Sequence, residues 1–506
     1  MKKKSFIMLM TAIILFCGCS GSHDEPTPTP KPEPKPEPVE PTVKISEEIQ
    51  LADKFAYDVL SDVYLWVSDI RKDLPKLDSK TCEDPIQTVQ DIRYKSDKEK
   101  DKWTLLTNDM ASMEGSSQGV ETTYGFSPIF GKFSNYDAYF VIIEYVYKDS
   151  PAAKAGMKRG DIIMELNGGD ITASNYLDVV YSSSAKFGMA EYNAKENVIQ
   201  LTGKTLNLKA VRMYEDPVLV DSVYEFKGKK VGYLAYAGFD QISAGKLIEV
   251  GKKFKAKGIK EIILDLRYNG GGYVSTEELL GSLIAPKTVV KGNEIFHTSI
   301  YNQGYMDYYK ENKKDLNTYF GMKHTITTDG KDSKEVDITD ANMDLTKVYA
   351  IITSGSASAS EGVLVALNPY MDIDLIGEQS HGKYCTGWML SPKDVYKNPS
   401  DKIKNWGIYV MVATFADKNG ENISRPNGLT PNFKVEDDPL DGYQLGDVRE
   451  SMLAAALKRA GKVDAVERVM TRSANERLQF KEIPFHYSKT FGMSIVKPSS
   501  EMLIKR

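Results

Sequence analysis

The sequence predicts an α/β layered core, preceded by an inserted domain that is mostly β and by a small helical N-terminal domain. The chain has 506 residues, which at roughly 150 residues per domain suggests about three domains. Hydrophobic residues make up 41% and charged residues 27%, an ordinary globular composition that excludes collagen, coiled coils and a mainly disordered chain. From residue 217 to residue 440, buried strand patterns alternate with helical ones, which is typical of a layered α/β core.

The charge balance argues against a nucleic-acid surface. Lysine and arginine total 65 against 70 aspartate and glutamate residues, and the formal net charge is −5. Three positive charges, Lys2 to Lys4, lie in a segment that we expect to be removed, which makes the mature chain more acidic still. A nucleic acid is therefore not an expected partner.

The N-terminal end predicts export. Lys2 to Lys4 precede an apolar run from Phe6 to Phe16, which is too short to span a bilayer because a spanning helix needs about twenty residues. A basic segment followed by a short apolar one is typical of a signal peptide, here residues 1–18. The dipeptide Gly18-Cys19 resembles a bacterial lipobox, which would place a lipid on the Cys19 thiol. A plain cleaved signal is the alternative.

The segment after Cys19 predicts a tether. Its acidic residues favour a lipid-anchored protein of the Gram-negative cell envelope, at the outer membrane and either periplasmic or surface-exposed. Between residues 26 and 41, eight of sixteen residues are proline. Residues 26–41, within a proline-rich linker at 19–45, therefore predict a polyproline II spacer about 50 Å long at 3.1 Å per residue. A ligand for a proline-recognition domain is the alternative.

Cysteine usage excludes a disulfide framework. Only Cys82 and Cys385 remain once the leader is removed and Cys19 is acylated. One disulfide between these two residues stays open as an alternative, but their spacing gives no local signal for it. The stability of the fold must therefore come from its hydrophobic cores.

Residues 46–110 predict the helical domain. Apolar residues recur there at the spacing of one helix face, at Ala52, Phe55, Ala56, Val59, Leu60 and Val63. Trp66 and Trp103 are expected in the core of this domain rather than in contact with a ligand.

Residues 120–214 predict strands around one short helix. Buried runs at 138–143 and 198–201 flank the helix, which Ser150 caps, Pro151 begins and Gly156 ends. The run from Asp149 to Ile163 resembles the helix and strand signature of bacterial PDZ domains. Such domains add an extended peptide as a strand and hold its terminal carboxylate with backbone N–H groups. The resemblance implies that Tyr124, Gly125 and Phe126 form the peptide-binding loop.

The α/β core contains two strand-to-helix junctions that could carry chemistry. Strands are expected at 231–234, 261–266, 348–352 and 373–376, and helices follow the second and third. The first junction holds the glycines Gly270, Gly271 and Gly272, whose backbone N–H groups can approach and stabilise an anion closely. A phosphate loop is the alternative, but its glycine spacing is missing. Residues 445–506 predict a helical tail, helical from Asp447 to about Met470 with a break at Gly461.

The second junction exposes a serine. Small residues around Ser358 would leave its hydroxyl at a helix N-terminus, which favours developing negative charge. Ser358 and Glu361 also fit a capping box, in which the serine only caps the helix. After the next strand comes Lys383, which can deprotonate a serine if burial lowers its pKa toward neutrality.

Together these motifs resemble the C-terminal processing peptidases, or tail-specific proteases. A PDZ domain is followed by Asp265-Leu266-Arg267-Tyr268-Asn269, then by Ser356-Ala357-Ser358-Ala359-Ser360-Glu361, and by Gly382-Lys383 in the register that the family has. The resemblance implies a crotonase-like or ClpP-like α/β core at residues 217–440. It also implies endoproteolysis of proteins or peptides selected through their free C-termini.

The resemblance assigns roles by position. Ser358 would be the nucleophile and Lys383 the general base, with no metal or cofactor. The N–H groups of Gly271 and Ala359 would form the oxyanion hole, although which of the three glycines donates stays open. Glu361 and Ser380 would support the site, with the Ser380 hydroxyl orienting the lysine.

Three residues depart from the family pattern. Gly387 and Pro369 occupy positions where relatives often have polar residues, so a third catalytic residue is unassigned. His381 could replace Lys383 as the partner of Ser358, and Cys385 is expected to be structural. The alternative function is therefore a catalytically weak or inactive peptide-binding or ligand-binding lipoprotein on the same fold. Acyl-CoA chemistry is disfavoured because an exported protein meets little CoA.

Some properties are left open by the sequence. It gives no preferred C-terminal residues, no oligomeric state, and no indication of whether the PDZ domain activates or inhibits. The membrane is expected as a partner only through the lipid anchor.

Overall fold

The structure is a computed structural model. It describes residues 44–96, 101–132, 138–327, 332–383, 385–421, 426–461, 478, 480–483 and 493–496. The chain divides into two units, Met1–Lys44 and Ile45–Arg506, and the second is described here. The predicted signal peptide, Cys19 and the proline-rich spacer to residue 43 lie outside the described residues. Within the described ranges, no helix is long and apolar enough to cross a membrane.

The N-terminal helices share a core with strands from the far end of the chain. The elements here are α1 (Glu47–Asp62), α2 (Val67–Ile70), η1 (Leu74–Lys76), α3 (Pro85–Ile92), β1 (Leu105–Thr107) and α4 (Met110–Ser117). The predicted apolar stripe of α1 is buried, and Ser46 caps the helix as a Ser side chain commonly does. Strand β1 pairs with β21 (Gly407–Ala416), and the helices pack in one hydrophobic cluster with β20 (Thr386–Leu390) and β21. This segment therefore packs against β20 and β21 rather than around a core of its own.

The PDZ segment contains one main sheet, a separate two-stranded sheet and two short helices. Its elements are β2 (Val120–Thr123), β3 (Phe126–Lys132), β4 (Tyr139–Val146), α5 (Pro151–Lys154), β5 (Ile162–Leu166), β6 (Gly169–Asp170), α6 (Asp178–Tyr181), β7 (Ser184–Asn193), β8 (Val198–Lys209) and β9 (Val211–Tyr214). Strands β2 and β9 form the two-stranded sheet. The predicted cap is confirmed, since the Ala153 N–H donates to Ser150 Oγ at 3.0 Å. Gly156 has the positive φ of 81° that ends such a helix.

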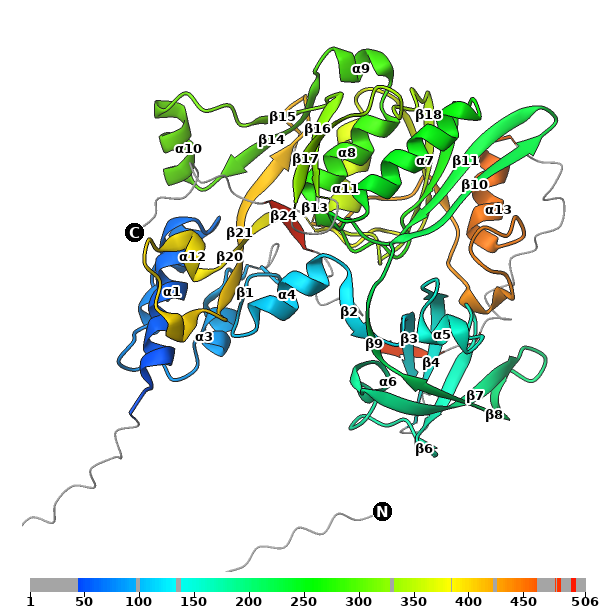
Figure 1. The fold of residues 1–506 in the computed structure, drawn as a ribbon, viewed down its shortest axis with the longest axis horizontal. Helices are drawn as coiled ribbons and strands as arrows, with labels where there is room; N and C mark the ends of the chain where they lie inside the picture. The colour runs from blue at the N-terminus through cyan, green and yellow to red at the C-terminus, as the bar shows by residue number, and fades with distance from the viewer. Residues whose placement is uncertain are drawn as a thin grey trace, which may run out of the picture. The chain divides into compact units, whose positions relative to one another are not determined.

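A six-stranded sheet forms the centre of the α/β core (Figure 1). Its order is β10 (Val218–Phe226), β11 (Lys229–Tyr236), β12 (Glu261–Asp265), β18 (Lys347–Ile352), β19 (Asp372–Gly377) and β22 (Phe433–Lys434). The strands from β11 to β22 are parallel. Alternate side chains pack against α7 (Ala244–Ala256), α8 (Val274–Ile284) and α11 (Ala359–Leu367) on one face, and against α13 (Ser451–Arg459) on the other. The predicted layered core is confirmed.

A second sheet joins distant parts of the chain. Its order is β13 (Gly272–Tyr273), β24 (Ser494–Val496), β20, β21, β14 (Ile295–Tyr301) and β15 (Asn317–Tyr319). The remaining elements are α9 (Lys287–Lys291), α10 (Gln303–Glu311), β16 (Lys323–Thr327), β17 (Ser333–Asp337), α12 (Pro392–Val395), η2 (Asp401–Ile403) and η3 (Pro439–Asp441).

The predicted helical tail is a helix from Ser451 to Arg459, and residues 462–477, with the predicted helix end near Met470, lie outside the described residues. The prediction of a helical tail is wrong for residues 481–483 and 494–496, which are strands. Helix α13 ends at Arg459, and Gly461 follows with φ 68°. The elements described after it are two strands, β23 (Lys481–Ile483) and β24. Each strand lies along a strand from another part of the chain, β3 for β23 and β13 and β20 for β24. Tertiary pairing therefore decides the conformation of these segments, and local sequence patterns do not report it.

Candidate active site

The two predicted strand-to-helix junctions meet. Strands β12 and β18 are parallel neighbours, so the segments that follow them leave the sheet at the same edge. The contact is close, because a Cβ on Gly271 would lie 2.7 Å from the Cβ of Ser358. Gly271 also has φ 104°, a backbone conformation that residues other than glycine rarely adopt. Position 271 of the first junction therefore requires glycine, because the backbone passes Ser358 there.

Ser358 occupies a strained turn at the start of α11. Its backbone has φ 62° and ψ −116°, which is rare for a residue with a side chain and is often found at functional sites. The residue is buried, and its Oγ has no hydrogen-bond partner in the part of the chain that the structure describes. The N–H of Glu361 donates to the Ser358 carbonyl oxygen at 2.9 Å. The predicted capping box is therefore present through the Glu361 carboxylate, which accepts the Ser358 backbone N–H, while the Ser358 hydroxyl has no hydrogen-bond partner among the described residues.

The Glu361 carboxylate holds the two predicted catalytic residues together. Its Oε2 accepts the backbone N–H of Ser358 at 2.9 Å and that of Lys383 at 3.0 Å. Its Oε1 accepts the N–H of Gly382 at 2.8 Å and the hydroxyl of Ser380. Burial raises the pKa of Glu361, while the hydrogen bonds from Ser380 and the three N–H groups lower it. Ser358 and Lys383, which the sequence places 25 residues apart, are thus both bound through their backbone N–H groups to the Glu361 carboxylate.

Ser380 does not contact the lysine amine through its hydroxyl. The hydroxyl donates to Glu361 and accepts the N–H of Leu429 at 2.6 Å. The expectation that this hydroxyl orients Lys383 directly is therefore wrong. Ser380 reaches the lysine only through Glu361, because the carboxylate already occupies the donor of that hydroxyl.

The Lys383 side chain is buried among aromatic rings. Its Nζ donates to Tyr409 Oη at 3.3 Å and lies 4.8 Å from the centre of the Trp103 ring. Burial lowers the pKa of Lys383 to about 8, and the nearby Cys385, Asp101 and Glu361 oppose this shift in part. A buried lysine with a lowered pKa is suited to act as a base near neutral pH.

Trp103 and Tyr409 are contacts that sequence reasoning missed. Trp103 was expected in a core, and it is buried, but it also faces the lysine amine. The two aromatic residues come together because β1 pairs with β21, with Leu105 opposite Tyr409. The sequence carries no signal for this pairing of segments about 300 residues apart.

The lysine and serine side chains are not hydrogen-bonded to each other in this structure. Lys383 Nζ donates to Tyr409, and Ser358 Oγ has no described partner. The backbones of the two residues are held together by Glu361, but Lys383 Nζ and Ser358 Oγ do not form a hydrogen bond.

The predicted oxyanion donors differ in their surroundings. The N–H of Gly271 donates to Asn269 Oδ1 at 2.9 Å, so it does not face an open oxyanion site as the resemblance implied. Asn269 is fully buried and is fixed by a second hydrogen bond, from its Nδ2 to the Tyr236 carbonyl oxygen at 2.9 Å. Ala359 is the first residue of α11, so its N–H lies at the helix N-terminus beside Ser358.

His381 and the cysteines are not arranged as a second catalytic group. His381 lies in the loop after β19, and burial lowers the pKa of its imidazole. Its ring is not bonded to Ser358 Oγ. Cys385 is buried with its Sγ 3.2 Å from Met411 Sδ. Cys82 and Cys385 are both free thiols, so the alternative of a disulfide between them is wrong.

The predicted peptide-binding loop leads into β3. Tyr124 and Phe126 are buried and their rings stack at 6.2 Å, while the N–H of Gly125 donates to Thr123 Oγ1 at 2.8 Å. A Cβ on Gly125 would lie 2.2 Å from the Cβ of Ser150, so only glycine fits beside the helix cap.

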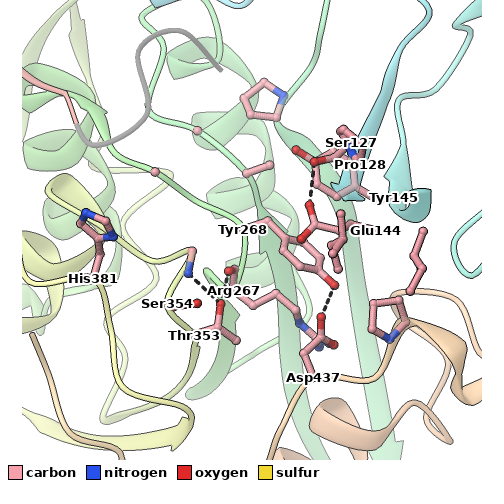
Figure 2. A pocket seen from close by; sticks show the side chains of 18 of the residues that line it. Ser127, Pro128, Glu144, Tyr145, Arg267, Tyr268, Thr353, Ser354, His381 and Asp437 are labelled. Atoms are coloured by element: carbon pink, nitrogen blue, oxygen red, sulfur yellow. Dashed lines mark hydrogen bonds and ion pairs between the residues drawn. The ribbon is translucent and has the colours of Figure 1, made fainter. Parts of the chain in front are cut away.

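A cavity connects the PDZ strand to the glycine turn (Figure 2). Its volume is about 420 Å³, and its lining includes Ser127 to Phe130, Gly270 to Gly272, Thr353 to Gly355 and His381. Glu144 also lines the cavity, and burial raises its pKa to about 8 although the Ser127 hydroxyl donates to it. Strand β3 and the predicted oxyanion turn therefore open onto one space, whereas the predicted peptide-binding residues Tyr124, Gly125 and Phe126 do not line it.

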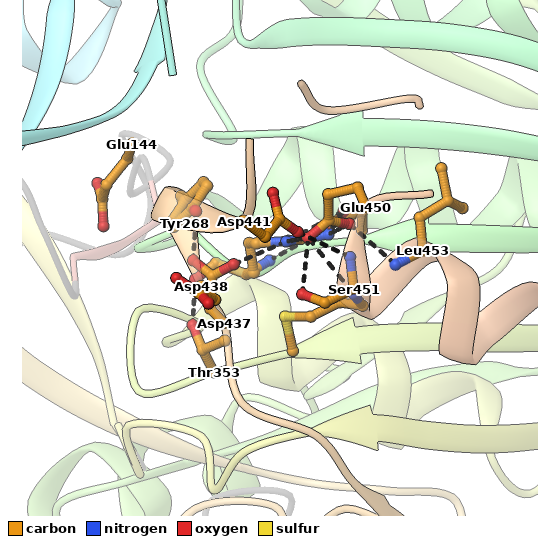
Figure 3. Close-up of polar contacts among 12 residues, drawn as sticks. Glu144, Tyr268, Thr353, Asp437, Asp438, Asp441, Glu450, Ser451 and Leu453 are labelled. Carbon is orange, nitrogen blue, oxygen red and sulfur yellow. Dashed lines mark hydrogen bonds and ion pairs between the residues drawn. The ribbon is translucent and has the colours of Figure 1, made fainter. Parts of the chain in front are cut away.

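A buried charge cluster joins the PDZ segment to the core (Figure 3). Arg267 lies 2.7 Å from Asp265, 2.7 Å from Glu450 and 2.9 Å from Asp437. Arg159 of the PDZ segment lies 2.7 Å from the same Asp437. Burial alone would lower the pKa of Arg267, but the three carboxylates raise it well above its ordinary value. The arginine that the sequence motif contains is therefore structural.

Comparisons with known proteins agree with these observations. Residues 230–435 match the model of peptidase family S41, and residues 142–185 match a PDZ domain. A crystal structure of an S41 protease from Bacteroides fragilis has the same fold, with a TM-score of 0.62 and 23% identity. That similarity covers 81% of this chain and 98% of the other.

Two curated relatives come from Bacillus subtilis strain 168. The carboxy-terminal processing protease CtpA is 26% identical over 297 residues, which are 58% of this chain and 53% of the relative. The carboxy-terminal processing protease CtpB is 25% identical over 417 residues, which are 73% and 74% of the two chains. The match thus spans about half of CtpA and three quarters of CtpB. The chain therefore resembles the carboxy-terminal processing proteases, and it combines a segment that matches peptidase family S41 with one that matches a PDZ domain.

Proposed function

We propose that this protein is a serine endopeptidase that cleaves exported proteins or peptides selected through their C-termini. The observation that carries the proposal is the Glu361 carboxylate, which accepts the backbone N–H groups of both Ser358 and Lys383. The lysine amine is buried there, and its pKa is lowered to about 8. A hydroxyl without a partner and an amine near neutral pKa are what a serine and lysine pair requires.

In this proposal Lys383 acts as a base and then as an acid. Its neutral Nζ takes the Ser358 proton while Oγ attacks the scissile carbonyl carbon. Backbone N–H groups at Ala359 and in the glycine turn stabilise the oxyanion of the tetrahedral intermediate. The C–N bond then breaks, and the leaving amine receives the proton from the Lys383 ammonium. Water hydrolyses the resulting acyl-enzyme by the same steps, and no metal or cofactor takes part.

Two rearrangements would turn this conformation into the reactive one. Lys383 Nζ must leave Tyr409 for Ser358 Oγ, and the N–H of Gly271 must turn away from Asn269 or leave the role to a neighbouring donor. We therefore propose that the described conformation is a resting one. Catalytic hydrogen bonds are often long or unmade until a substrate binds.

The same two observations favour the second candidate, a peptide-binding lipoprotein with weak or no catalysis. A fluorophosphonate probe separates the two functions. Labelling of the wild-type protein that is lost in Ser358→Ala supports the peptidase. If Ser358 stays unlabelled even after the PDZ domain has been loaded with a peptide, the binding function is favoured.

The direct test is proteolysis. Ser358→Ala should abolish cleavage of an unfolded test protein and should leave the thermal unfolding transition within about 1 °C, because only one buried oxygen is removed. Test proteins that differ only in their last three residues then measure selection at the C-terminus. Equal cleavage by the wild-type protein and by Ser358→Ala would rule out the serine mechanism.

We also propose that Cys19 carries a lipid and anchors the protein in the Gram-negative cell envelope, at the outer membrane. The sequence around Gly18-Cys19 supports this proposal. Metabolic labelling with an alkynyl fatty acid should mark the wild-type protein and not Cys19→Ala. A labelled Cys19→Ala protein would contradict the proposal.

A further inference from the structure

The peptide edge of the PDZ sheet is already paired with another part of the chain. Strand β3 lies between β4 and β23 in the sheet, and β23 comes from the C-terminal tail (Figure 1). The pairing is antiparallel, with Lys481 opposite Lys132 and Ile483 opposite Phe130. A PDZ domain binds its ligand by adding an extended peptide to this kind of sheet edge. The tail therefore lies where a ligand would be added.

The direction of the tail also fits that of a ligand. Residue numbers rise along β23 as they fall along β3, so the tail advances toward Phe126 at the start of β3. Tyr124 and Gly125, the predicted carboxylate loop, come immediately before Phe126. A peptide whose C-terminal carboxylate binds that loop would run in the same sense.

The side chains of the tail show what the edge accepts. The Phe480 ring lies 5.2 Å from the Phe140 ring, and a Cβ on Gly131 would come within 2.8 Å of Phe480. Leu478 and Phe480 pack in one apolar cluster with Phe140 and Ile142. Lys481 and Glu482 are exposed. Ile483 packs against the cluster that contains Phe126 and Phe130. Apolar residues at both ends thus anchor a short strand whose middle is held through its backbone.

A second contact keeps the tail close to the active site. Strand β24 pairs with β13 on one side and with β20 on the other. The Met493 carbonyl oxygen lies 3.0 Å from the position of a Cβ on Gly271. Helix α13 and β24 therefore fix the chain on both sides of β23, which raises the effective concentration of β23 at β3.

The cavity between the PDZ strand and the glycine turn contains the tail as well. Phe480, Glu482 and Ile483 line it together with Gly270 to Gly272. A peptide that lies along β3 and continues toward Ser358 would meet β23 in its path.

We propose that β23 is an internal peptide ligand of the PDZ domain, and that a substrate C-terminus must displace it from β3 before binding. The external partner is an extended peptide with a free carboxylate and an apolar residue near its end. This inference rests on the proposed function and describes how that function would be regulated.

Peptide binding to the full chain in a Ser358→Ala background tests the inference independently of catalysis. The probe is a fluorescein-labelled peptide, Gly-Ser-Phe-Lys-Glu-Ile with a free carboxyl end, and fluorescence anisotropy gives its Kd. Lys481→Pro removes a backbone N–H from β23, and Phe480→Ala removes its apolar anchor. Lys481→Ala is the matched control, because it changes the same exposed side chain and keeps the backbone N–H.

We expect both Lys481→Pro and Phe480→Ala to bind the probe at least fivefold more tightly than the parent, and Lys481→Ala to match the parent. The amidated peptide should bind less tightly to all of them. Hydrogen exchange should show residues 126–132 deprotected in the two tail variants and protected again by the peptide. Unchanged affinity in Phe480→Ala, which keeps the backbone intact, would overturn the inference. Weaker binding in the tail variants would also overturn it, since β23 would then build the site rather than occupy it.

Fluorophosphonate labelling of Ser358 in the wild-type protein distinguishes failure of this inference from failure of the proposed function. Labelling together with unchanged peptide affinity leaves the peptidase in place and removes only the internal ligand.

Discussion

At the scale of single residues, the site depends on the contacts that Glu361 and two aromatic rings make with Lys383. The carboxylate fixes the lysine backbone at 3.0 Å, and Trp103 and Tyr409 surround its amine. A buried amine resists protonation because the interior solvates an ammonium poorly. The chemistry and the stability of the protein should therefore both depend on the charge of this one group.

The first prediction concerns activity against pH. Only the neutral amine of Lys383 can accept the serine proton, and its pKa is about 8. We expect kcat/KM to rise about tenfold per pH unit below pH 8 and to level off above it. Lys383→Arg should be inactive at every pH, since its guanidinium stays charged. A profile that is flat from pH 6 to pH 9 would contradict the assignment of the base.

The second prediction concerns stability against pH. The unfolded lysine keeps its proton up to its ordinary value of 10.5, whereas the folded one releases it near pH 8. The unfolded state thus binds more protons between these values, so stability rises as pH increases from 8 to 10.5 and is lowest below pH 8. The free energy of unfolding of Lys383→Met should therefore exceed that of the wild-type protein by about 3 kcal/mol at pH 7. This difference between the two proteins should become smaller toward pH 10. Urea unfolding at both pH values measures this difference, and a less stable Lys383→Met protein at pH 7 would contradict it.

The closeness of Ser358 and Lys383 was anticipated from the family resemblance, and it arises because the strands that they follow, β18 and β19, are parallel neighbours in the sheet. The supporting role of Glu361 was also anticipated by position, but its contacts with both backbones were not. Trp103 could not be anticipated as part of the site. It reaches Lys383 across a strand pair whose members are far apart in the sequence, and local patterns carry no information about such a pair.

At the scale of elements, the glycine turn between β12 and α8 is tightly constrained by its neighbours. Gly271 touches Ser358, and a side chain there would also lie 3.0 Å from the Met493 carbonyl oxygen. Its neighbour Gly272 has φ 141° and would place a Cβ 2.4 Å from the Phe239 carbonyl oxygen. Backbone atoms cannot move aside as the end of a flexible side chain can.

The third prediction follows from this turn. Gly271→Ala should lower the free energy of unfolding by about 1–3 kcal/mol and should reduce fluorophosphonate labelling at Ser358, because the turn must shift away from the serine. Gly245→Ala is the matched control, since a Cβ at this position in α7 meets nothing within 4 Å. The control should be as stable as the wild-type protein or more stable by about 1 kcal/mol. Equal behaviour of the two variants in urea unfolding and labelling would contradict the close contact.

Elements were predicted well where local patterns determine them. The stripe of α1, the cap of α5 and the buried parallel strands all follow from side-chain periodicity and capping residues. The tail was predicted as a helix because it was judged by local composition alone. Strands β23 and β24 exist because β3, β13 and β20 offer paired edges, which is a property of the fold and not of the segment itself.

At the scale of the whole molecule, four distant segments converge on one charge cluster. Arg267 follows β12, Arg159 belongs to the PDZ segment, Asp437 lies after β22 and Glu450 caps α13. All four charges are largely removed from water, so each depends on the others for compensation.

The fourth prediction follows from this cluster. Arg267→Met should lower the free energy of unfolding by about 3–5 kcal/mol, because it leaves buried carboxylates without compensation. Arg449→Met is the control. It removes an exposed arginine that is paired with Asp447 on the surface, and it should leave the free energy of unfolding nearly unchanged. Urea unfolding of both variants measures the difference, and similar costs would contradict a structural role for the cluster.

The pairing of β1 with β21 sets a lower limit on the size of any working fragment. Trp103 reaches the active lysine from a segment that precedes the PDZ domain, and α1 packs in the same cluster as the strand that bears Tyr409. A shortened version that starts at the PDZ domain would uncover the edge of β21 and let water reach the amine. We therefore expect a fragment that starts at the PDZ domain to lose the enclosed amine that the proposed mechanism needs, so a working fragment should include the chain from α1 onward.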